Sequence, residues 1–387
     1  MTKNNKKLAV IGASYLQQPL VEKAKEMGLE VHCFAWEKGA VCKDIADHFY
    51  PISIIEKEEI LSICQQIGIN GICTIASDVA APTVAYVAEK MGLVGNSYES
   101  AVRANNKYLM RESFSKADIP CPKYMVATPE TLNTPTVLDG LREFQYPIII
   151  KPSDRSGSLG VSKICAPAEY YPAINQAMKV SFKHEAMIEE FIDGREISVE
   201  FISYQGHHYP LQITDKVTTG APHFVELEHH QPSSLSKDMY ETIYSITEKA
   251  LNALGITNGA SHSEYKITPK GRIAIMEIGA RMGGDFIGSD LVRLSTGYDF
   301  VKGVIEVALN EFEEPKKTIN MYSGVFFLCK ETEFIKPIFD KWQYRPEIVQ
   351  CEITDEVIHD VKCSADRSGY FIYQANKKFN YEKNKIH

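Results

Sequence analysis

The sequence has no long hydrophobic run and no tract of basic residues. Its start, MTKNNKKLAVIGAS, has a basic head, but the apolar run that follows stops at Gly12 and is too short for a signal peptide. No run of about 18 apolar residues occurs elsewhere, and the 387-residue chain carries a net charge of −8. These absences argue against nucleic acid or an anionic membrane as a partner and predict a soluble, cytoplasmic protein.

Cysteine pairs with metal-ligand spacing are also missing. The nine cysteines are scattered and none forms a Cys-x-x-Cys pair. An odd number without such spacing predicts reduced thiols rather than a disulfide framework or a zinc site. Hydrophobic residues make up 44% and charged residues 24% of the chain, which is typical of a globular protein, and the length favours two to four domains.

The first hundred residues alternate between strand and helix patterns. Residues 7–11, KLAVI, form a continuous apolar run before Gly-Ala-Ser, as expected for a buried parallel strand that feeds a turn. A doubly wound parallel sheet is therefore predicted over about residues 1–100, with helices at 16–28 and 56–67 and further strands at 29–35 and 72–76. The turn at 12–14 lacks a full G-x-G-x-x-G fingerprint, so strand ends that line a substrate cleft are favoured over a nicotinamide site.

The remainder of the chain is predicted to be α+β and mainly antiparallel. Pro- and Thr-rich stretches at 119–122 and 128–136 predict a linker region. After it we expect strands at 146–151, 186–190, 196–204, 208–215, 262–268 and 272–278, with helices at 167–179 and 235–254. The last part, from about residue 311, has strand patterns near 321–330 and 369–375 and is expected to form a small closing module.

Residues 146–164, YPIIIKPSDRSGSLGVSKI, place Lys151 at the end of an apolar strand and before a loop of small residues. Backbone N–H groups of small residues can close around phosphate oxygens, and a lysine beside them supplies positive charge. The lysine precedes the glycines, so this is not a Walker A loop. An ordinary hairpin turn is the competing interpretation.

Residues 187–201, MIEEFIDGREISVEF, form two strand patterns joined by Asp-Gly. The backbone edge at 190–192 could bind an adenine, and Glu196 is within reach of ribose hydroxyls. A plain Asp-Gly hairpin is the commoner meaning of such a sequence.

Residues 261–285, SHSEYKITPKGRIAIMEIGARMGGD, predict a hairpin that turns at Pro269–Gly271. On this hairpin Glu264 and Glu277 lie opposite each other. Two facing carboxylates repel, which raises the pKa of one of them unless a cation lies between them. Oxygen ligands of this kind suit Mg²⁺, although a solvated surface is the usual explanation of a single glutamate on a strand.

The order of these segments is more specific than any one of them. Lys107, Lys151 with its glycine loop, the segment from Glu189 to Glu196, and the Glu264/Glu277 pair follow one another as in the ATP-grasp superfamily, which the whole chain resembles. The resemblance implies a preATP-grasp domain at 1–110, an ATP-grasp domain at 111–310 and a C-terminal module at 311–387. Within the ATP-grasp domain it implies a small subdomain at 111–185 and a large one at 186–310.

The resemblance also implies a role for each matching residue. ATP and Mg²⁺ (or Mn²⁺) would be the cofactors, with the metal on Glu264 and Glu277. Catalysis would rest on Arg281 and Lys151. The nucleotide would be held by Lys107, Lys151, Ser156, Gly157, Ser158, Glu189, Glu190, Ile192, Glu196 and Lys216.

Two features set this chain apart within the superfamily. Many members have Asn two residues after the second metal-binding glutamate, whereas this chain has Gly279, so the number of metal ions is an open question. The stretch 218–233, TTGAPHFVELEHHQPS, resembles a substrate loop of the L-amino-acid-ligase branch and implies substrate contacts from Glu226, His229, His230 and Arg281. Histidines on a loop surface are the alternative.

Three functions remain open from the sequence. The first is a ligase that activates a carboxylate as an acyl phosphate for attack by an amine, with small-molecule substrates of both kinds. The second is an enzyme that activates bicarbonate or formate. The third is a non-catalytic nucleotide-binding protein. The acids, amines and pathway are not defined by the sequence, and the acidic, tyrosine-rich chain could form a homodimer.

Overall fold

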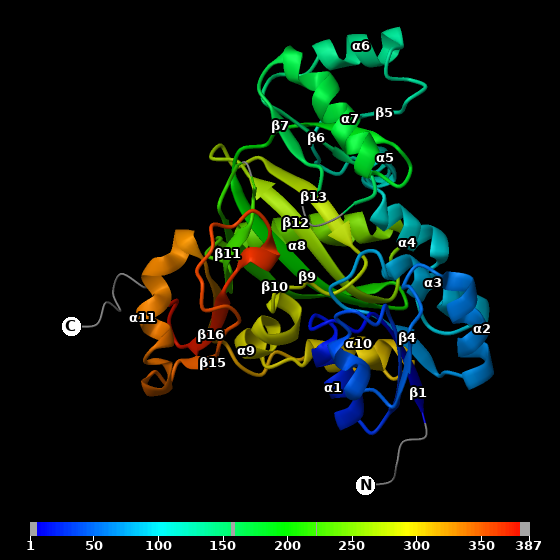
Figure 1. Ribbon diagram of the computed structural model, residues 1–387, viewed down its shortest axis with the longest axis vertical. Coiled ribbons are helices and arrows are strands. Elements are labelled where there is room, and N and C mark those ends of the chain that lie inside the picture. The colour runs from blue at the N-terminus through cyan, green and yellow to red at the C-terminus, as the bar shows by residue number, and fades with distance from the viewer. Residues whose placement is uncertain (1–5, 156–158, 222, 380–387) are drawn as a thin grey trace.

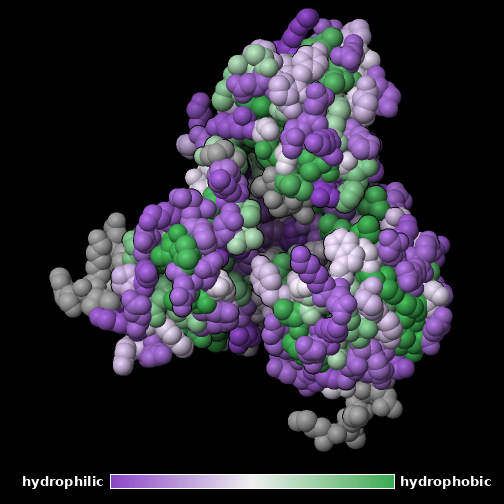
Figure 2. Space-filling view, in the orientation of Figure 1, coloured by the Kyte–Doolittle hydropathy of each residue, from purple (hydrophilic) through white to green (hydrophobic). Residues whose placement is uncertain are grey.

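The computed structural model describes residues 6–155, 159–221 and 223–379. Their strands form three sheets, and the chain folds into lobes around a central hollow (Figures 1 and 2). A small sheet stands at the top of Figure 1, the N-terminal sheet lies at the lower right, and the C-terminal strands lie at the left. None of the helices in this described part is both long and apolar enough to span a bilayer.

The N-terminal sheet is parallel, as the sequence predicted, with the strand order β3-β2-β1-β4. Apolar residues on both of its faces are buried, which explains the continuous apolar run of the first strand. Its elements are β1 (Lys7–Ile11), α1 (Gln18–Glu26), β2 (Glu30–Phe34), η1 (Val41–Asp44), β3 (His48–Tyr50), α2 (Lys57–Ile67), β4 (Gly71–Cys73) and α3 (Ala81–Met91).

Two helices then lead from the N-terminal sheet to the rest of the chain. They are α4 (Tyr98–Asn105) and α5 (Lys107–Lys116). The Asn106 side chain caps α5 by accepting a hydrogen bond from the backbone N–H of Leu109 at 2.9 Å. This cap fixes Lys107 as the first residue of the helix.

The small sheet is antiparallel, with the order β5-β8-β6-β7. Two helices pack their apolar residues against it. The prediction of a linker in this part of the chain is therefore wrong in part, because the region contains a strand and the start of a helix. The helix begins with a proline, a residue favoured in the first helical turn. The elements are β5 (Tyr124–Ala127), α6 (Pro135–Arg142), β6 (Ile148–Pro152), β7 (Ser162–Ile164), η2 (Pro167–Glu169), α7 (Tyr170–Val180) and β8 (Ala186–Glu190).

The large sheet is antiparallel, with the order β13-β12-β9-β10-β11-β14-β16-β15. The C-terminal strands, expected in a separate closing module, extend this same sheet. Its strands are β9 (Arg195–Tyr204), β10 (His207–Thr218), β11 (Glu226–Gln231), β12 (Gly259–Ile267), β13 (Ile273–Gly279), β14 (Tyr322–Leu328), β15 (Ile348–Ile353) and β16 (Gly369–Ala375).

Helices cover both faces of the large sheet. On one face α8 (Lys237–Leu254) and α5 share a core with β9, β12 and β13. On the other face α10 (Phe300–Ala308) lies between this sheet and the N-terminal sheet, so one core joins the two. The remaining elements are η3 (Ile287–Leu291), α9 (Val292–Thr296), η4 (Lys330–Ile335), α11 (Lys336–Phe339), η5 (Trp342–Tyr344) and η6 (Ser364–Asp366).

The segment expected as a substrate loop, 218–233, is a strand over Glu226–Gln231. Its sequence, ELEHHQ, has little apolar alternation, so its position between β10 and β14 was not apparent. Polar side chains can be accommodated there because they face a cavity or find buried partners, as described below.

Candidate active site

A cavity of about 490 Å³ lies where the small sheet, the large sheet and the N-terminal domain meet. In Figure 2 hydrophilic residues line the hollow between the upper lobe and the two lower lobes. The cavity collects residues that lie far apart in the sequence. Of the predicted site residues it is lined by Lys107, Lys151, Glu189, Glu190, Ile192, Glu196, Lys216, Glu226, His229, Glu264, Glu277 and Arg281.

Three predicted nucleotide-binding residues, Ser156, Gly157 and Ser158, lie outside the described residues. Arg155 and Leu159, which precede and follow them, both line the cavity. The backbone carbonyl of Arg155 accepts a hydrogen bond from Lys107 Nζ at 2.8 Å. The base of the serine-glycine segment is therefore attached to the predicted phosphate-binding lysine.

Glu264 and Glu277 face each other across the β12–β13 hairpin, as the sequence predicted. Each carboxylate has a lysine partner. Lys216 contacts Glu264, and Lys107 donates to Glu277 at 2.9 Å. The attraction of Lys216, which outweighs the effect of burial, holds the pKa of Glu264 well below its usual value. The rise in pKa expected for two facing acids without a cation therefore does not occur at Glu264.

The side chains of the two lysines are more deeply buried than those of the two acids. Burial opposes the charged form of Lys216, but Glu264 and Glu226 outweigh burial and raise its pKa. Burial likewise opposes the charge on Lys107, and Glu277 outweighs it, so the pKa of Lys107 is raised as well. Both lysines are therefore positively charged at neutral pH and lie on the cavity wall.

Lys151, near the end of β6, contacts Glu189 on the neighbouring strand β8, two residues beyond Met187, its direct cross-strand partner. Burial dominates at Lys151 and lowers its pKa despite the attraction of Glu189. Glu189 also pairs with Arg111 at 2.8 Å, and both side chains are almost completely buried. Arg111 was missed in the sequence, although its position four residues after Lys107 places it on the same face of α5.

Two further acids among the predicted nucleotide contacts have partners of their own. Glu190 pairs with Arg272 through two hydrogen bonds, one of them 2.9 Å long, which ties the small sheet to the β12–β13 hairpin. Glu196 pairs with Lys266 at 3.0 Å. These acids therefore mark the line along which the two sheets meet.

Arg281 is held by Asp78, a residue that sequence reasoning missed. Its Nε and one terminal nitrogen donate to the two Asp78 oxygens at 2.8 and 2.7 Å. Asp78 follows β4 in the N-terminal domain, about two hundred residues away in the chain, so no local pattern links the pair. Burial alone would raise the pKa of Asp78, but Arg281 outweighs burial and lowers it.

The same pair explains why residue 279 is glycine. A Cβ built on Gly279 would lie 2.6 Å from Asp78 Oδ1 and 3.0 Å from Arg281 Nε. Real Cβ atoms essentially never approach closer than 3.0 Å. The asparagine that the family resemblance implied at this position would therefore collide with the Asp78–Arg281 pair.

We expect Gly279→Asn to lower the free energy of unfolding by about 3 kcal/mol, because breaking a buried ion pair costs roughly that amount. Urea denaturation would measure the change. Gly206→Asn is the matched control, because Gly206 has open space around its Cβ position and a φ of 82° that asparagine tolerates. Equal stability of the two variants would contradict a rigid Asp78–Arg281 pair.

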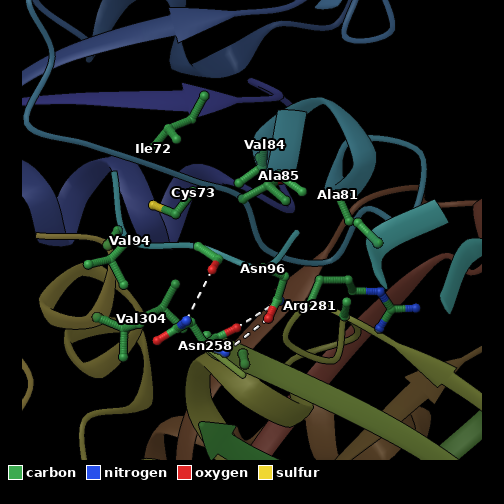
Figure 3. A pocket seen from close by; sticks show the side chains of 18 residues that line it. Ile72, Cys73, Ala81, Val84, Ala85, Val94, Asn96, Asn258, Arg281 and Val304 are labelled. Atoms are coloured by element: carbon green, nitrogen blue, oxygen red, sulfur yellow. Dashed lines mark hydrogen bonds between the residues drawn. The ribbon is translucent and has the colours of Figure 1, made fainter. Parts of the chain in front are cut away.

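A second, smaller cavity of about 60 Å³ lies beside Arg281 (Figure 3). Hydrogen bonds between Asn96 and the segment before β12 cross one side of it. Asn96 donates to the Asn258 carbonyl at 2.8 Å and accepts from the Thr257 N–H at 2.8 Å. These bonds attach the N-terminal domain to the start of β12.

His229 lies on the cavity face of β11, opposite Lys216 on β10. Its Nε2 is 4.0 Å from Asp285. Burial lowers the pKa of His229, so the ring is neutral at neutral pH. Glu226, the first residue of β11, has a carboxylate oxygen 3.6 Å from Lys216 Nζ.

His230 is the predicted substrate residue that the structure places elsewhere. Side chains alternate along a strand, so His230 points to the opposite face of β11 from His229. It is bonded to the Tyr373 hydroxyl at 3.0 Å and to Glu228 at 2.8 Å. It does not line the cavity, and we leave it out of the site.

Asp285 and Arg367 form a further pair that the sequence did not reveal. Two bonds of 2.8 Å join them, and the Arg367 guanidinium lies 3.7 Å from the ring centre of Phe327. Burial alone would raise the pKa of Asp285, but His229 and Arg367 outweigh burial and hold it well below its usual value. The pair connects the C-terminal segment to the cavity wall.

We expect Arg367→Met to destabilise the protein by about 3 kcal/mol at neutral pH. The folded pKa of Asp285 lies below its unfolded value, so the pair contributes stability above that unfolded value and loses it as the pH falls. The difference in unfolding free energy between wild type and Arg367→Met should therefore shrink below about pH 4. Arg142→Met, which breaks an exposed pair with Asp139, should cost less than about 1 kcal/mol. A difference in unfolding free energy between wild type and Arg367→Met that does not change with pH would contradict an ion pair between Asp285 and Arg367.

Comparison with known proteins supports the interpretation of the fold. A family model described as ATP-grasp domain matches residues 144–290. The chain is 23% identical to an L-amino acid ligase from Bacillus licheniformis, with a TM-score of 0.79 over 99% of this chain and 97% of that one. It also superposes on the ADP complex of an N5-carboxyaminoimidazole ribonucleotide synthetase, with a TM-score of 0.76 at 15% identity over 97% of this chain and 95% of that one.

Two curated relatives are similar in sequence. An alanine–anticapsin ligase from Bacillus subtilis (strain 168) is 29% identical over 59% of this chain and 51% of the relative. A D-alanine–D-alanine ligase from Bacillus pumilus is 24% identical over 58% of this chain and 65% of the relative. The chain thus spans about half the length of the first relatives it matches. The match to the ATP-grasp domain model over residues 144–290 agrees with the motif order of the sequence. Relatives and structural neighbours that resemble this chain include ligases that act on amino acids.

Proposed function

We propose that this protein is an ATP-dependent ligase, active in the cytoplasm, that activates a carboxylate as an acyl phosphate and joins it to an amine. The observation that supports this most is the convergence of three buried lysines and two opposed glutamates in one cavity. Lys107, Lys151 and Lys216 come from three separate elements, and each has an acidic partner in the cavity wall. Such a group of charges suits a bound triphosphate with its metal ion.

The nucleotide would lie along the junction of the small and large sheets. Lys107, Lys151 and Lys216 would contact phosphate oxygens, together with the backbone at 156–158. The segment from Glu189 to Ile192 would hold the adenine, and Glu196 the ribose. The cavity is of suitable size, because small-molecule sites usually measure about 300–1,000 Å³ and this one measures about 490 Å³.

The donor set fits Mg²⁺ or Mn²⁺, since two carboxylates on paired strands are hard oxygen ligands. The ion, when bound, would polarise phosphate oxygens and neutralise charge that develops on them. Lys107 and Lys216 would then no longer be needed to neutralise Glu277 and Glu264. Both ammonium groups would be free to turn toward the phosphate oxygens.

The substrates would occupy the end of the cavity formed by Arg281, Glu226 and His229. A substrate carboxylate oxygen would attack the γ-phosphorus, forming an acyl phosphate and ADP. The amine nitrogen would then attack the acyl carbon, and inorganic phosphate would leave. Arg281, held by Asp78, still has N–H groups to direct at the acyl phosphate. The acidic and histidine side chains beside it favour an amino acid as one substrate.

A screen for ADP release tests this proposal. Purified protein with MgATP is offered pairs of amino acids and small acids, each with and without the second component. We expect ADP and phosphate release that needs both an acid and an amine. Release that needs only bicarbonate or formate would contradict amine ligation, and tight ATP binding without turnover on any pair would contradict an enzyme.

A further inference from the structure

A second cluster of metal-ligand side chains lies in the N-terminal domain, away from the cavity. Glu30 and His32 are two residues apart on β2, so they project from the same face of the sheet. His48 is the direct cross-strand partner of His32 on the parallel strand β3. The register of the two strands therefore brings one carboxylate and two imidazoles together.

The spacing of these groups suits a metal ion. Glu30 Oε1 lies 3.0 Å from His32 Nε2 and 3.5 Å from His48 Nε2, and the three ligand atoms all lie within 4.8 Å of one another. An ion such as Zn²⁺ with bonds of about 2.0–2.1 Å holds tetrahedral ligand atoms roughly 3.3–3.4 Å apart. Small side-chain shifts would therefore place all three ligands around one ion.

A partner on the other ring nitrogen fixes the orientation of His32. Its Nδ1 is 3.2 Å from the Tyr50 hydroxyl, which leaves Nε2 directed at Glu30. Metal-binding histidines usually have such a partner on the nitrogen that does not bind the metal. The rings of His32 and His48 are stacked, with centroids 4.6 Å apart, which also limits the motion of His48.

The lysine on the adjacent strand is directed away from the cluster. Lys7, on β1 opposite Glu30, is the cation of the adjacent strand, and its Nζ donates to the Ile67 carbonyl at 3.1 Å. It is therefore directed at the backbone of another segment.

We propose that Glu30, His32 and His48 bind a divalent transition-metal ion of the Zn²⁺ class. The side chains of Glu30 and His48 are 39% and 51% exposed, so an ion can reach them, and that of His32 is 3% exposed. Three protein ligands leave a fourth position for water. Two imidazoles with one carboxylate favour Zn²⁺, Co²⁺ or Ni²⁺ over Mg²⁺. The ion would fasten the short edge strand β3 to β2, and this role does not depend on the proposed ligase activity.

Isothermal titration of tag-free, chelator-treated protein with Zn²⁺ tests the site. Excess Mg²⁺ is present to compete at oxygen-ligand sites such as Glu264 and Glu277, since it binds imidazole poorly. We expect one Zn²⁺ to bind with a rise in melting temperature, and His48→Ala to lose both effects. Tyr50→Phe, which keeps the ring and removes the hydroxyl, should weaken binding by about tenfold.

His207→Ala is the matched control, because His207 is an exposed strand histidine outside both sites. It should bind Zn²⁺ as wild type does. Co²⁺ should give visible absorption bands of a nitrogen- and oxygen-ligated site in wild type and not in His48→Ala. Zn²⁺ binding and stabilisation that are the same in wild type and His48→Ala would overturn the proposal.

Discussion

Replacing Glu277 by Gln is expected to lower ATP turnover by at least about 100-fold, because even residues that only support metal ligands typically contribute 10- to 100-fold. Gln keeps the shape of the side chain and removes its charge. The substitution would take one of two carboxylates from the proposed Mg²⁺ site and leave Lys107 without its partner at 2.9 Å. The measurement is the rate of ADP release at saturating MgATP and substrates.

Two further variants make this result specific. Glu264→Gln should show a similar loss, since Glu264 is the other carboxylate of the pair. Glu248→Gln, on the exposed side of α8, should keep full activity. Turnover by Glu277→Gln within about threefold of wild type would contradict a role of this carboxylate in catalysis.

Replacing Lys216 by Met is expected to have two opposite effects. ADP release should fall by about 100-fold, because a fixed charge directed at the phosphates is lost. Binding of Mn²⁺ measured without nucleotide should become tighter, because Lys216 is the ammonium group that competes with a cation for Glu264. Kinetics and Mn²⁺ titration on the same preparation measure both effects.

The opposite signs separate this explanation from a general loss of structure. A misfolded variant would lose both activity and metal binding. Lys249→Met, an exposed lysine on α8, should change neither property. Weaker Mn²⁺ binding by a folded Lys216→Met variant would contradict the competition between lysine and cation.

The β12–β13 hairpin could be predicted because the residues that determine its pairing are close together in the sequence. A short turn and a side-chain period of two fix which residues lie opposite, so Glu264 and Glu277 could be paired from sequence. Lys151 could be placed for a similar reason, since an apolar strand delivers it to a loop of small residues. The parallel N-terminal sheet followed from the continuous apolar runs of strands buried on both faces.

Other parts of the site depend on contacts that no local pattern records. Asp78 meets Arg281, and Asp285 meets Arg367, only through the packing of separate parts of the chain. The strand β11 was missed because its buried positions carry polar side chains, including His229, which packs beside Asp285. Gly279 was noticed in the sequence as a departure, but its cause became visible only when Asp78 was found in the space of its absent side chain.

The central claim is that Glu264 and Glu277 hold a metal ion beside a bound triphosphate. Crystals grown with Mn²⁺ and a non-hydrolysable ATP analogue would test it through the anomalous scattering of Mn²⁺. We predict an anomalous peak between the two carboxylates, at metal–oxygen distances of about 2.0–2.3 Å, with the phosphates beside Lys107 and Lys216. A nucleotide bound in the cavity with its metal peak remote from both carboxylates would contradict the account.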